Sequence, residues 1–232
     1  MTFEHVMEEL RSRGKEQTAK IYRRHGMHGE VLGVSFADLG KLQKQIKVDH
    51  PLAQKLWKSG VADANALAFM VADPAKTSSD ELEWLVSELG NYSGCDGLSG
   101  FVVRTKFAES KMKKWMKSQD EWIGRTGWTL VSHLAQKDMS IPDSFFEHAL
   151  VTIEKTIHSS KNFTRHAMAF ALIGIAVRNP DLEKKATAAA GRIGKVVVDH
   201  GETNCKTPDA IEYIKKIKAH RAKKAGRSAA KV

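Results

Sequence analysis

The stretch KNFTRHAMAFALIGIAVR at residues 161–178 is apolar on almost every side when it is wound as a helix. Only its first turn is polar, and Asn179-Pro180 directly after it is a signal that ends one helix and starts the next. A helix that is apolar all round belongs in the interior of a protein rather than on its surface. Residues 161–178 are therefore predicted to form a helix at the centre of the fold.

Apolar residues three or four positions apart continue the helical pattern on both sides of this segment. All five prolines stand where a helix would begin or end, and no stretch alternates with the period of two that marks a strand. We expect helices over 2–24, 35–47, 50–59, 61–72, 77–89, 93–103, 108–117, 119–136, 142–157, 161–178, 180–197 and 207–222. Helices of this length with short connections, and without heptads or a sharp repeat motif, predict an all-α solenoid of degenerate helical pairs.

Charge is distributed unevenly along the 232 residues, which carry a formal net charge of +10 from 37 basic and 27 acidic residues. Eight of the basic residues follow Glu212, the last acidic residue, so the rest of the chain is nearly neutral. The total charge therefore indicates a basic tail rather than a basic protein. We expect residues 1–222 to form one helical-repeat domain and residues 223–232 to form a basic, disordered C-terminal tail.

Two short segments of the near-neutral body are basic. Between Arg104 and Lys117 stand six basic residues and a single acidic one, Glu109. The second cluster consists of Lys155, His158, Lys161, Arg165 and His166. Each cluster predicts either a surface that binds phosphate groups or an ordinary solvated helix face.

Several classes of protein do not fit this sequence. No apolar run reaches the roughly 18–20 residues that cross a bilayer, and the opening MTFEHVMEELRSRG does not form a secretory signal. The two cysteines exclude a disulfide scaffold and indicate a reducing compartment. Five residues could in principle meet at a metal ion, although a buried thiol and a capped loop explain them better: Cys95, Asp199, His200, Glu202 and Cys205. With neither HExxH nor CxxC present, we expect a cytoplasmic protein without a metal, another cofactor or a membrane partner.

The predicted helix 119–136 carries polar groups where a core helix would not. Arg125 lies on the face opposite the apolar stripe, beside Trp122, a second tryptophan and two hydroxyl groups. An arginine in such surroundings can rest on an indole ring and fork onto a phosphate group. It can equally be a surface arginine whose stem covers apolar edges.

The segment LGNYSGCDGLSG at residues 89–100 contains four glycines, which allow another surface to come close. Asp96 stands in this segment ahead of an apolar helix, and Tyr92 lies one helical turn earlier. Taken alone, the pattern predicts a helix start with Asp96 as a capping residue.

Over roughly residues 3–220 the chain resembles the bacterial DNA alkylation repair proteins of the AlkD type. Each motif that carries the resemblance is short, and their order and spacing together make it more specific. In chain order the motifs are Val31-Leu32-Gly33-Val34, the pair Tyr92 and Asp96, Trp122-Ile123-Gly124-Arg125, the helix Phe163–Pro180 and the loop Asp199–Ala210.

The resemblance implies a DNA glycosylase built from HEAT-like repeats, which grips duplex DNA and excises cationic N3- or N7-alkylated purines. It implies that the Asp96 carboxylate stabilises the positive charge that develops on the sugar as the glycosidic bond breaks. Tyr92 and Phe170 would be aromatic contacts to that cation, and Arg125 would hold a phosphate group. The remaining DNA contacts would come from Arg104, Lys106, Lys113, Lys161, Arg165 and Trp122. No cofactor is implied, and we expect a monomer in the bacterial cytoplasm or nucleoid.

The sequence departs from the family pattern at three places. The pattern has tryptophan at both aromatic positions, where this chain has Tyr92 and Phe170, and a further basic residue where this chain has Ile173. Cations are attracted most strongly by tryptophan and less by tyrosine or phenylalanine. A second interpretation is therefore a catalytically silent HEAT-like protein that binds damaged or branched DNA. A third, favoured by the near-neutral body, is a protein scaffold without affinity for DNA.

Overall fold

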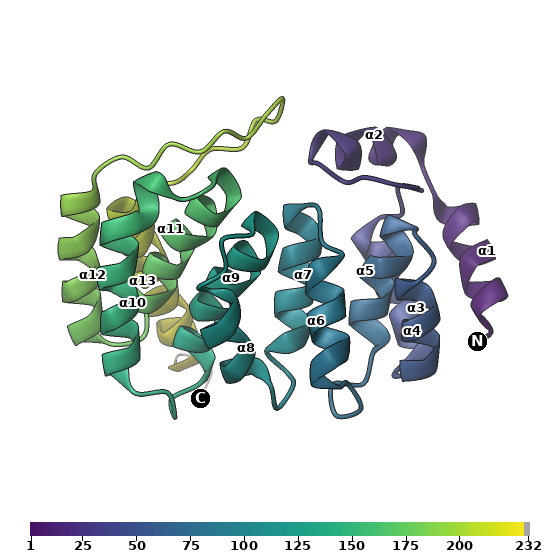
Figure 1. The fold of residues 1–232 in the computed structure, drawn as a ribbon, viewed down its shortest axis with the longest axis horizontal. Coiled ribbons are helices and arrows are strands. Elements are labelled where there is room, and N and C mark those ends of the chain that lie inside the picture. Colours follow the sequence, from purple (N-terminus) through teal and green to yellow (C-terminus); the bar gives the residue numbers. More distant parts are fainter. Residues whose placement is uncertain (230–232) are drawn as a thin grey trace. The chain divides into compact units, whose positions relative to one another are not determined.

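The computed structural model describes residues 1–229, and within that range the chain is helical and contains no β-strand. Figure 1 shows the helices in chain order from purple to yellow. Their bounds are α1 Phe3–Arg13, α2 Glu16–Arg24, α3 Phe36–Ile46, α4 His50–Trp57, α5 Ala62–Val71, α6 Ser79–Ser87, α7 Tyr92–Val102, α8 Ala108–Trp115, α9 Glu121–Lys137, α10 Asp143–Thr156, α11 Asn162–Ala176, α12 Pro180–Ile193 and α13 Ala210–Ala229, with a short 3-10 turn at Ile157–Ser159. The all-α prediction is confirmed. None of the described helices is long and apolar enough to cross a membrane.

The helices divide into two compact units. Unit 1 contains residues 1–114 together with 200–204, and unit 2 contains residues 115–199 together with the chain from residue 205 onward. Each unit has its own apolar core. The expectation of a single domain over residues 1–222 spans both units and stays a prediction.

Unit 1 is organised around α5, a largely apolar helix that packs against α3, α4 and α7. Leucines from successive helices meet in its core: Leu10, Leu39, Leu42, Leu56, Leu67, Leu82 and Leu98. The buried carboxylate of Asp63, in the first turn of α5, accepts the main-chain N–H groups of Leu32 at 2.7 Å and of Val34 at 2.7 Å. Charge-assisted bonds of this kind are among the stronger ones in proteins. They fix the chain between α2 and α3 onto α5.

Unit 2 is organised around α11, which packs against α9, α10, α12 and α13. The prediction of a central helix in this part of the chain is thus confirmed. Gly174 on α11 permits the close approach to α9, because a Cβ atom there would lie 2.8 Å from the Cα atom of Ser132. At Gly127 on α9 a Cβ atom would lie 2.1 Å from the main-chain nitrogen of Met116. Both contacts are possible only for glycine.

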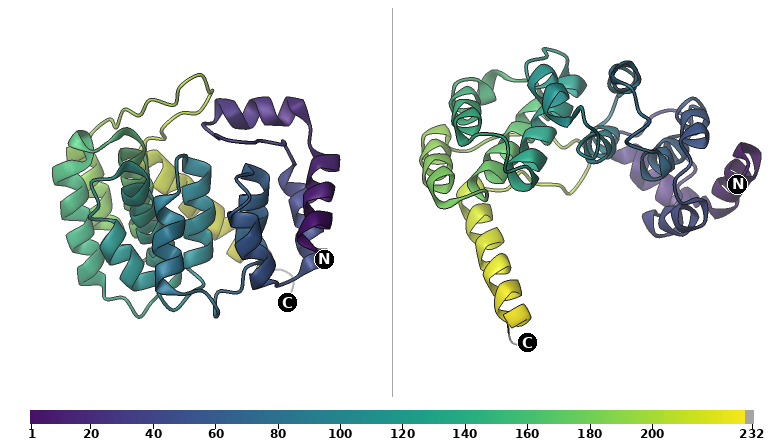
Figure 2. Two further views of the ribbon diagram at one scale, coloured as in Figure 1. Left: turned by 45° about the vertical axis from the view of Figure 1, so that its right-hand side comes forward. Right: turned by 90° about the horizontal axis from the view of Figure 1, so that it is seen from below.

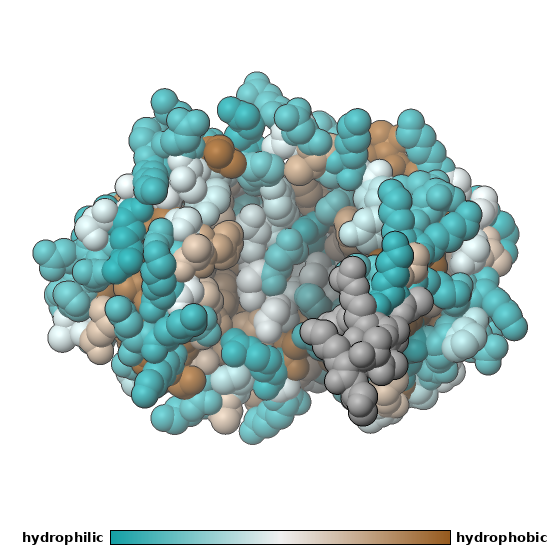
Figure 3. All heavy atoms as spheres, turned by 180° about the vertical axis from the view of Figure 1, so that it is seen from behind, coloured by the Kyte–Doolittle hydropathy of each residue, from teal (hydrophilic) through white to brown (hydrophobic). Residues whose placement is uncertain are grey.

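Few large apolar side chains remain on the surface. The face drawn in Figure 3 is mostly hydrophilic, with apolar residues in isolated patches. The most exposed aromatic side chain is Phe36, at 62%. Single exposed apolar residues are common in soluble proteins, whereas residues that gather at a hollow point to a binding site.

The prediction of one helix over residues 2–24 is wrong, since α1 ends at Arg13 and α2 begins at Glu16. The chain turns at Gly14, where a Cβ atom would lie 2.7 Å from the main-chain oxygen of Leu32. The next residue, Lys15, donates its main-chain N–H to Gly33 at 3.2 Å. A contact with residues far along the chain therefore interrupts a sequence whose local pattern is helical.

The C-terminal boundaries also differ from the predictions. Helix α12 ends at Ile193 rather than residue 197, because Gly194 takes a positive φ of 69° that ends the helix. Helix α13 runs over Ala210–Ala229, so residues 223–229 are helical and not disordered as predicted. Their sequence consists largely of alanine, lysine and arginine, which are strong helix formers. The last three residues of the predicted tail, 230–232, lie outside the described residues.

Candidate functional site

The glycine-containing segment 89–100 forms the start of α7, and Asn91 rather than Asp96 is its cap. The side chain of Asn91 accepts the main-chain N–H of Gly94 at 2.8 Å. Asp96 is exposed in the second turn of the helix. The expectation that Asp96 caps the helix is wrong, because a residue in the second turn lies beyond the amide groups that a cap satisfies.

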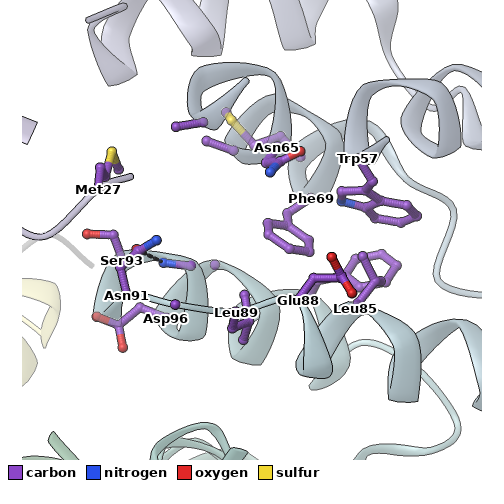
Figure 4. A pocket seen from close by; sticks show the side chains of 18 of the residues that line it. Met27, Trp57, Asn65, Phe69, Leu85, Glu88, Leu89, Asn91, Ser93 and Asp96 are labelled. Atoms are coloured by element: carbon purple, nitrogen blue, oxygen red, sulfur yellow. Dashed lines mark hydrogen bonds between the residues drawn. The ribbon is translucent and has the colours of Figure 1, made fainter. Parts of the chain in front are cut away.

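Asp96 lines a pocket of about 740 Å³ that lies entirely within unit 1. The walls come from α3, α5, the end of α6, α7 and the loop at Met27 that follows α2. In Figure 4, Asp96 lies near Ser93 and Asn91 at one end, and Phe69 and Trp57 lie towards the other. The pocket was not predicted from the sequence, because its walls come from segments far apart in the chain.

Tyr92 is held by His25, the residue that ends α2. The Tyr92 hydroxyl group forms a hydrogen bond with Nδ1 of His25. The two rings meet edge to face with their centroids 6.1 Å apart. The resemblance did not point to His25 as a site residue. It joins the basic helix α2 to the first turn of α7 and so sets the direction of the Tyr92 ring.

The three basic residues predicted to bind DNA in unit 1 have different surroundings. Arg104 donates to the main-chain oxygen of Phe69 at 2.8 Å, and partial burial lowers the pKa of its guanidinium group below the usual value for arginine. Lys106 is exposed and lies 5.2 Å from the centre of the Phe107 ring. Lys113 is exposed and paired with Glu109 at 2.5 Å.

Lys111, in the same basic cluster, is a structural residue. It is buried, and its ammonium group donates to the main-chain oxygen of Ser79 at 2.9 Å and to the carboxylate of Glu83 at 2.5 Å. A buried ammonium group needs such partners because it has lost its contact with water. Part of the cluster therefore holds α8 against α6. Only its solvent-exposed basic side chains can reach a ligand.

Arg125 in unit 2 is buried, with 3% of its surface exposed. Nη1 of Arg125 lies 3.0 Å from Nδ1 of His166 and 3.4 Å from the main-chain oxygen of Phe163. The Phe170 ring is half-buried and lies edge-on to His166, with centroids 4.9 Å apart. His166 thus connects Arg125 with Phe170, and the guanidinium group faces the protein rather than solvent. The close packing of α9 on α11 is the physical reason for this burial.

The other predicted DNA contacts of unit 2 lie at the start of α11 and on α9. The guanidinium group of Arg165 donates to three main-chain oxygens, of Ile157 at 3.2 Å, Ser160 at 2.9 Å and Val197 at 2.9 Å. It therefore ties together the segments around α11. Lys161 is exposed.

Trp122 is half-buried and stacks on Phe163, with ring centroids 5.2 Å apart and 25° between the planes.

Of the four residues expected to be catalytic, Tyr92 and Asp96 come together in unit 1. Arg125 and Phe170 come together in unit 2. Among the described residues, no three histidine, cysteine or acidic side chains gather as metal ligands.

The comparison with known families assigns the chain. A family model described as "DNA alkylation repair enzyme" matches residues 6–214. The chain belongs to the DNA alkylation repair enzyme family. The resemblance stated from the sequence motifs is thereby confirmed.

Two relatives of this repair family member come from Listeria. An uncharacterized protein of Listeria innocua is 31% identical over 224 residues, which cover 94% of this chain and 98% of that protein. An uncharacterized protein of Listeria monocytogenes is 30% identical with the same coverage.

A solved structure is similar to this family member in fold, with a TM-score of 0.87, 30% identity and 93% of each chain covered. It is described as a new family of proteins related to the HEAT-like repeat DNA glycosylases with affinity for branched DNA structures. The helical pairs of the present chain are therefore HEAT-like repeats, as predicted.

Proposed function

We propose that this protein binds branched DNA during DNA repair and does not itself excise bases. The burial of Arg125 is the observation that carries the proposal. A guanidinium group that is buried against His166 inside unit 2 offers little exposed surface to a phosphate group. The residue to which the resemblance gives the role of holding the phosphate group beside the lesion is thus used for packing.

The aromatic residues support the same proposal. Tyr92 and Phe170 stand where the glycosylase pattern has tryptophan, and the attraction of their rings for a sugar cation is weaker. The Phe170 ring is also covered on one edge by His166 and contacts Tyr213, with centroids 6.1 Å apart. A stabilising group must be aimed at the developing charge before the reaction starts. These two rings instead serve contacts within the protein.

The similar solved structure favours branched DNA as the ligand. That protein, related to the DNA glycosylases, is described as having affinity for branched DNA, and the present chain shares its fold over 93% of its length. Contacts to the phosphate backbone position a protein on DNA without reading its sequence. Exposed basic side chains such as Lys20, Arg24 and Lys106 suit that task. We propose a monomer that acts in the nucleoid.

The proposal is tested by single-turnover incubation of the protein with a duplex that contains one 7-methylguanine. We expect the DNA to be bound, as followed by fluorescence anisotropy, and no 7-methylguanine to be released above the rate without protein. An AlkD-type glycosylase serves as the positive control for release. Release by the wild-type protein at a rate proportional to the bound fraction would contradict the proposal.

Excision of cationic alkylpurines is the second candidate function, and the position of Asp96 favours it. The Asp96 carboxylate is exposed at a pocket and could stabilise the positive charge that forms on the sugar as the base departs with its bonding electrons. The Asp96→Asn variant separates the two functions. Release by the wild-type protein that is lost in Asp96→Asn, with unchanged DNA affinity, would establish a glycosylase with Asp96 as its catalytic carboxylate.

A further inference from the structure

We infer that the pocket of unit 1 receives one unpaired nucleobase of the bound DNA. The inference rests on the proposed binding of branched DNA and goes beyond it by naming the site and the group that enters it. The volume of about 740 Å³ lies within the range of roughly 300–1,000 Å³ that is usual for small-molecule sites. Some branch points in DNA carry unpaired bases, and an unpaired base can be turned out of the helix at a lower cost than a paired one.

Two exposed aromatic side chains lie at the pocket. Phe36 is 62% exposed and Trp84 is 36% exposed, and both belong to its lining. An unpaired base stacks on an aromatic ring with a gain of about 1–3 kcal/mol, whatever its identity. Exposed rings at a hollow are therefore suitable surfaces for stacking a base. Without a ligand these rings stay in contact with water, which is unfavourable for apolar surface.

The inner wall of the pocket is a rigid aromatic cluster. The rings of Trp57, Phe69 and Phe101 have centroid separations of 5.7, 5.8 and 6.2 Å, and all three residues are buried. Figure 4 shows Phe69 and Trp57 on one side of the space, with the labelled residues of α6 and α7 facing them. Arg104 holds Phe69 in place through the main-chain oxygen of that residue. The hollow therefore has a fixed shape into which a flat ring can enter.

The pocket lining contains carboxylates, whereas the nearby helix α2 carries exposed basic side chains. This distribution of charge suits a nucleotide. Glu88 and Asp96 supply carboxylates to the lining, and carboxylates accept hydrogen bonds from the amino groups of bases. Arg104 also lines the pocket, but its guanidinium group donates to the main-chain oxygen of Phe69. The two carboxylates repel phosphate groups, so the backbone stays outside. Lys20 and Arg24 are exposed on α2, which leads directly to the lining residue Met27. The backbone would pass along α2 while the base points inward.

The test uses a four-way junction that carries 2-aminopurine at one unpaired position near the crossover. Stacking of this fluorescent base on an indole ring quenches it, and we expect the wild-type protein to lower its fluorescence by about twofold or more. Trp84→Leu removes the exposed indole ring and is expected to lose most of this quenching. Phe36→Leu removes the second exposed ring and is expected to lose part of it, because the base is then held less firmly. Val151→Ala, which shortens an exposed side chain of unit 2, is the control and should quench like the wild type.

Anisotropy of a distant label on the same junction separates the possible failures. We expect both pocket variants to keep DNA affinity within about threefold, because the phosphate contacts dominate binding. Full quenching by both pocket variants, or bound DNA whose 2-aminopurine stays bright, would overturn the inference and leave the proposed function standing. A junction that does not bind at all would overturn both.

Discussion

Removal of the chain after Arg221 is expected to weaken DNA binding by up to about a thousandfold at 0.1 M salt. The removed residues include Lys223, Lys224, Arg227 and Lys231 and no acidic residue. Each phosphate group neutralised by a basic side chain contributes roughly −0.9 to the slope of log K against log salt, so four contacts change the slope by about 3 to 4. Titrations of a labelled junction at several salt concentrations measure this slope.

The structure provides a reason for cutting at this point. Arg221 anchors α13 with bonds to the main-chain oxygen of Val177 at 2.8 Å and to Gln136 at 2.9 Å. The C-terminal part of α13 runs away from the other helices of unit 2, as the right-hand view of Figure 2 shows. Loss of the extension should therefore leave the core of unit 2 intact.

A variant in which the four basic residues are replaced by glutamine is the matched control for this truncation. Glutamine keeps a high helix propensity, so the control removes charge without removing the helix. If charge is the cause, both proteins lose the same part of the slope. An unchanged slope in both would show that the C-terminal helix does not bind the DNA backbone.

Replacement of Arg178 by methionine is expected to lower the free energy of unfolding by about 2–4 kcal/mol, because each buried polar group that is left without its partner costs about 1–3 kcal/mol. The side chain of Arg178 is 4% exposed and lies in an ion pair with Asp143 at 2.7 Å. Its guanidinium group also donates to the main-chain oxygens of Ala135, Asp138 and Ile141. The loss of these bonds leaves three carbonyl groups without this donor at the α9–α10 connection.

Arg192→Met is the matched control, measured by the same urea unfolding. Arg192 is paired with Glu154 at 2.6 Å, but its side chain is 60% exposed. Exposed ion pairs contribute little to stability because water competes for both charges. An equal loss of stability in the two variants would contradict the role assigned to Arg178 in holding unit 2 together.

Local sequence patterns were sufficient to predict most of the helices. Thr2 and Ser35 each accept a main-chain N–H from the helix that they start, which is usual for these residue types at a helix start. The apolar pattern of residues 161–178 correctly indicated the central helix α11. These features depend on residues within a few positions of each other. The break at Gly14 could not be predicted in this way, because it depends on packing against Leu32.

The candidate site was harder to predict from the sequence, because it depends on packing between segments that are far apart in the chain. The types and spacing of Tyr92 and Asp96 could be recognised as a pair, but not the pocket that they adjoin. A basic pattern does not distinguish an outward lysine from Lys111, which is buried against Glu83. It also does not reveal that Arg125 faces His166. Burial of charged side chains is decided by the packing between helices, which no local pattern records.

The protein is proposed to recognise the shape of branched DNA. The most direct measurement is a competition in which unlabelled linear duplex displaces a labelled four-way junction of the same sequence and length at 0.15 M salt. We expect the linear duplex to compete at least about tenfold less well per molecule, since binding through the phosphate backbone without shape recognition would treat both alike. Equal competition by the two DNAs would contradict the account.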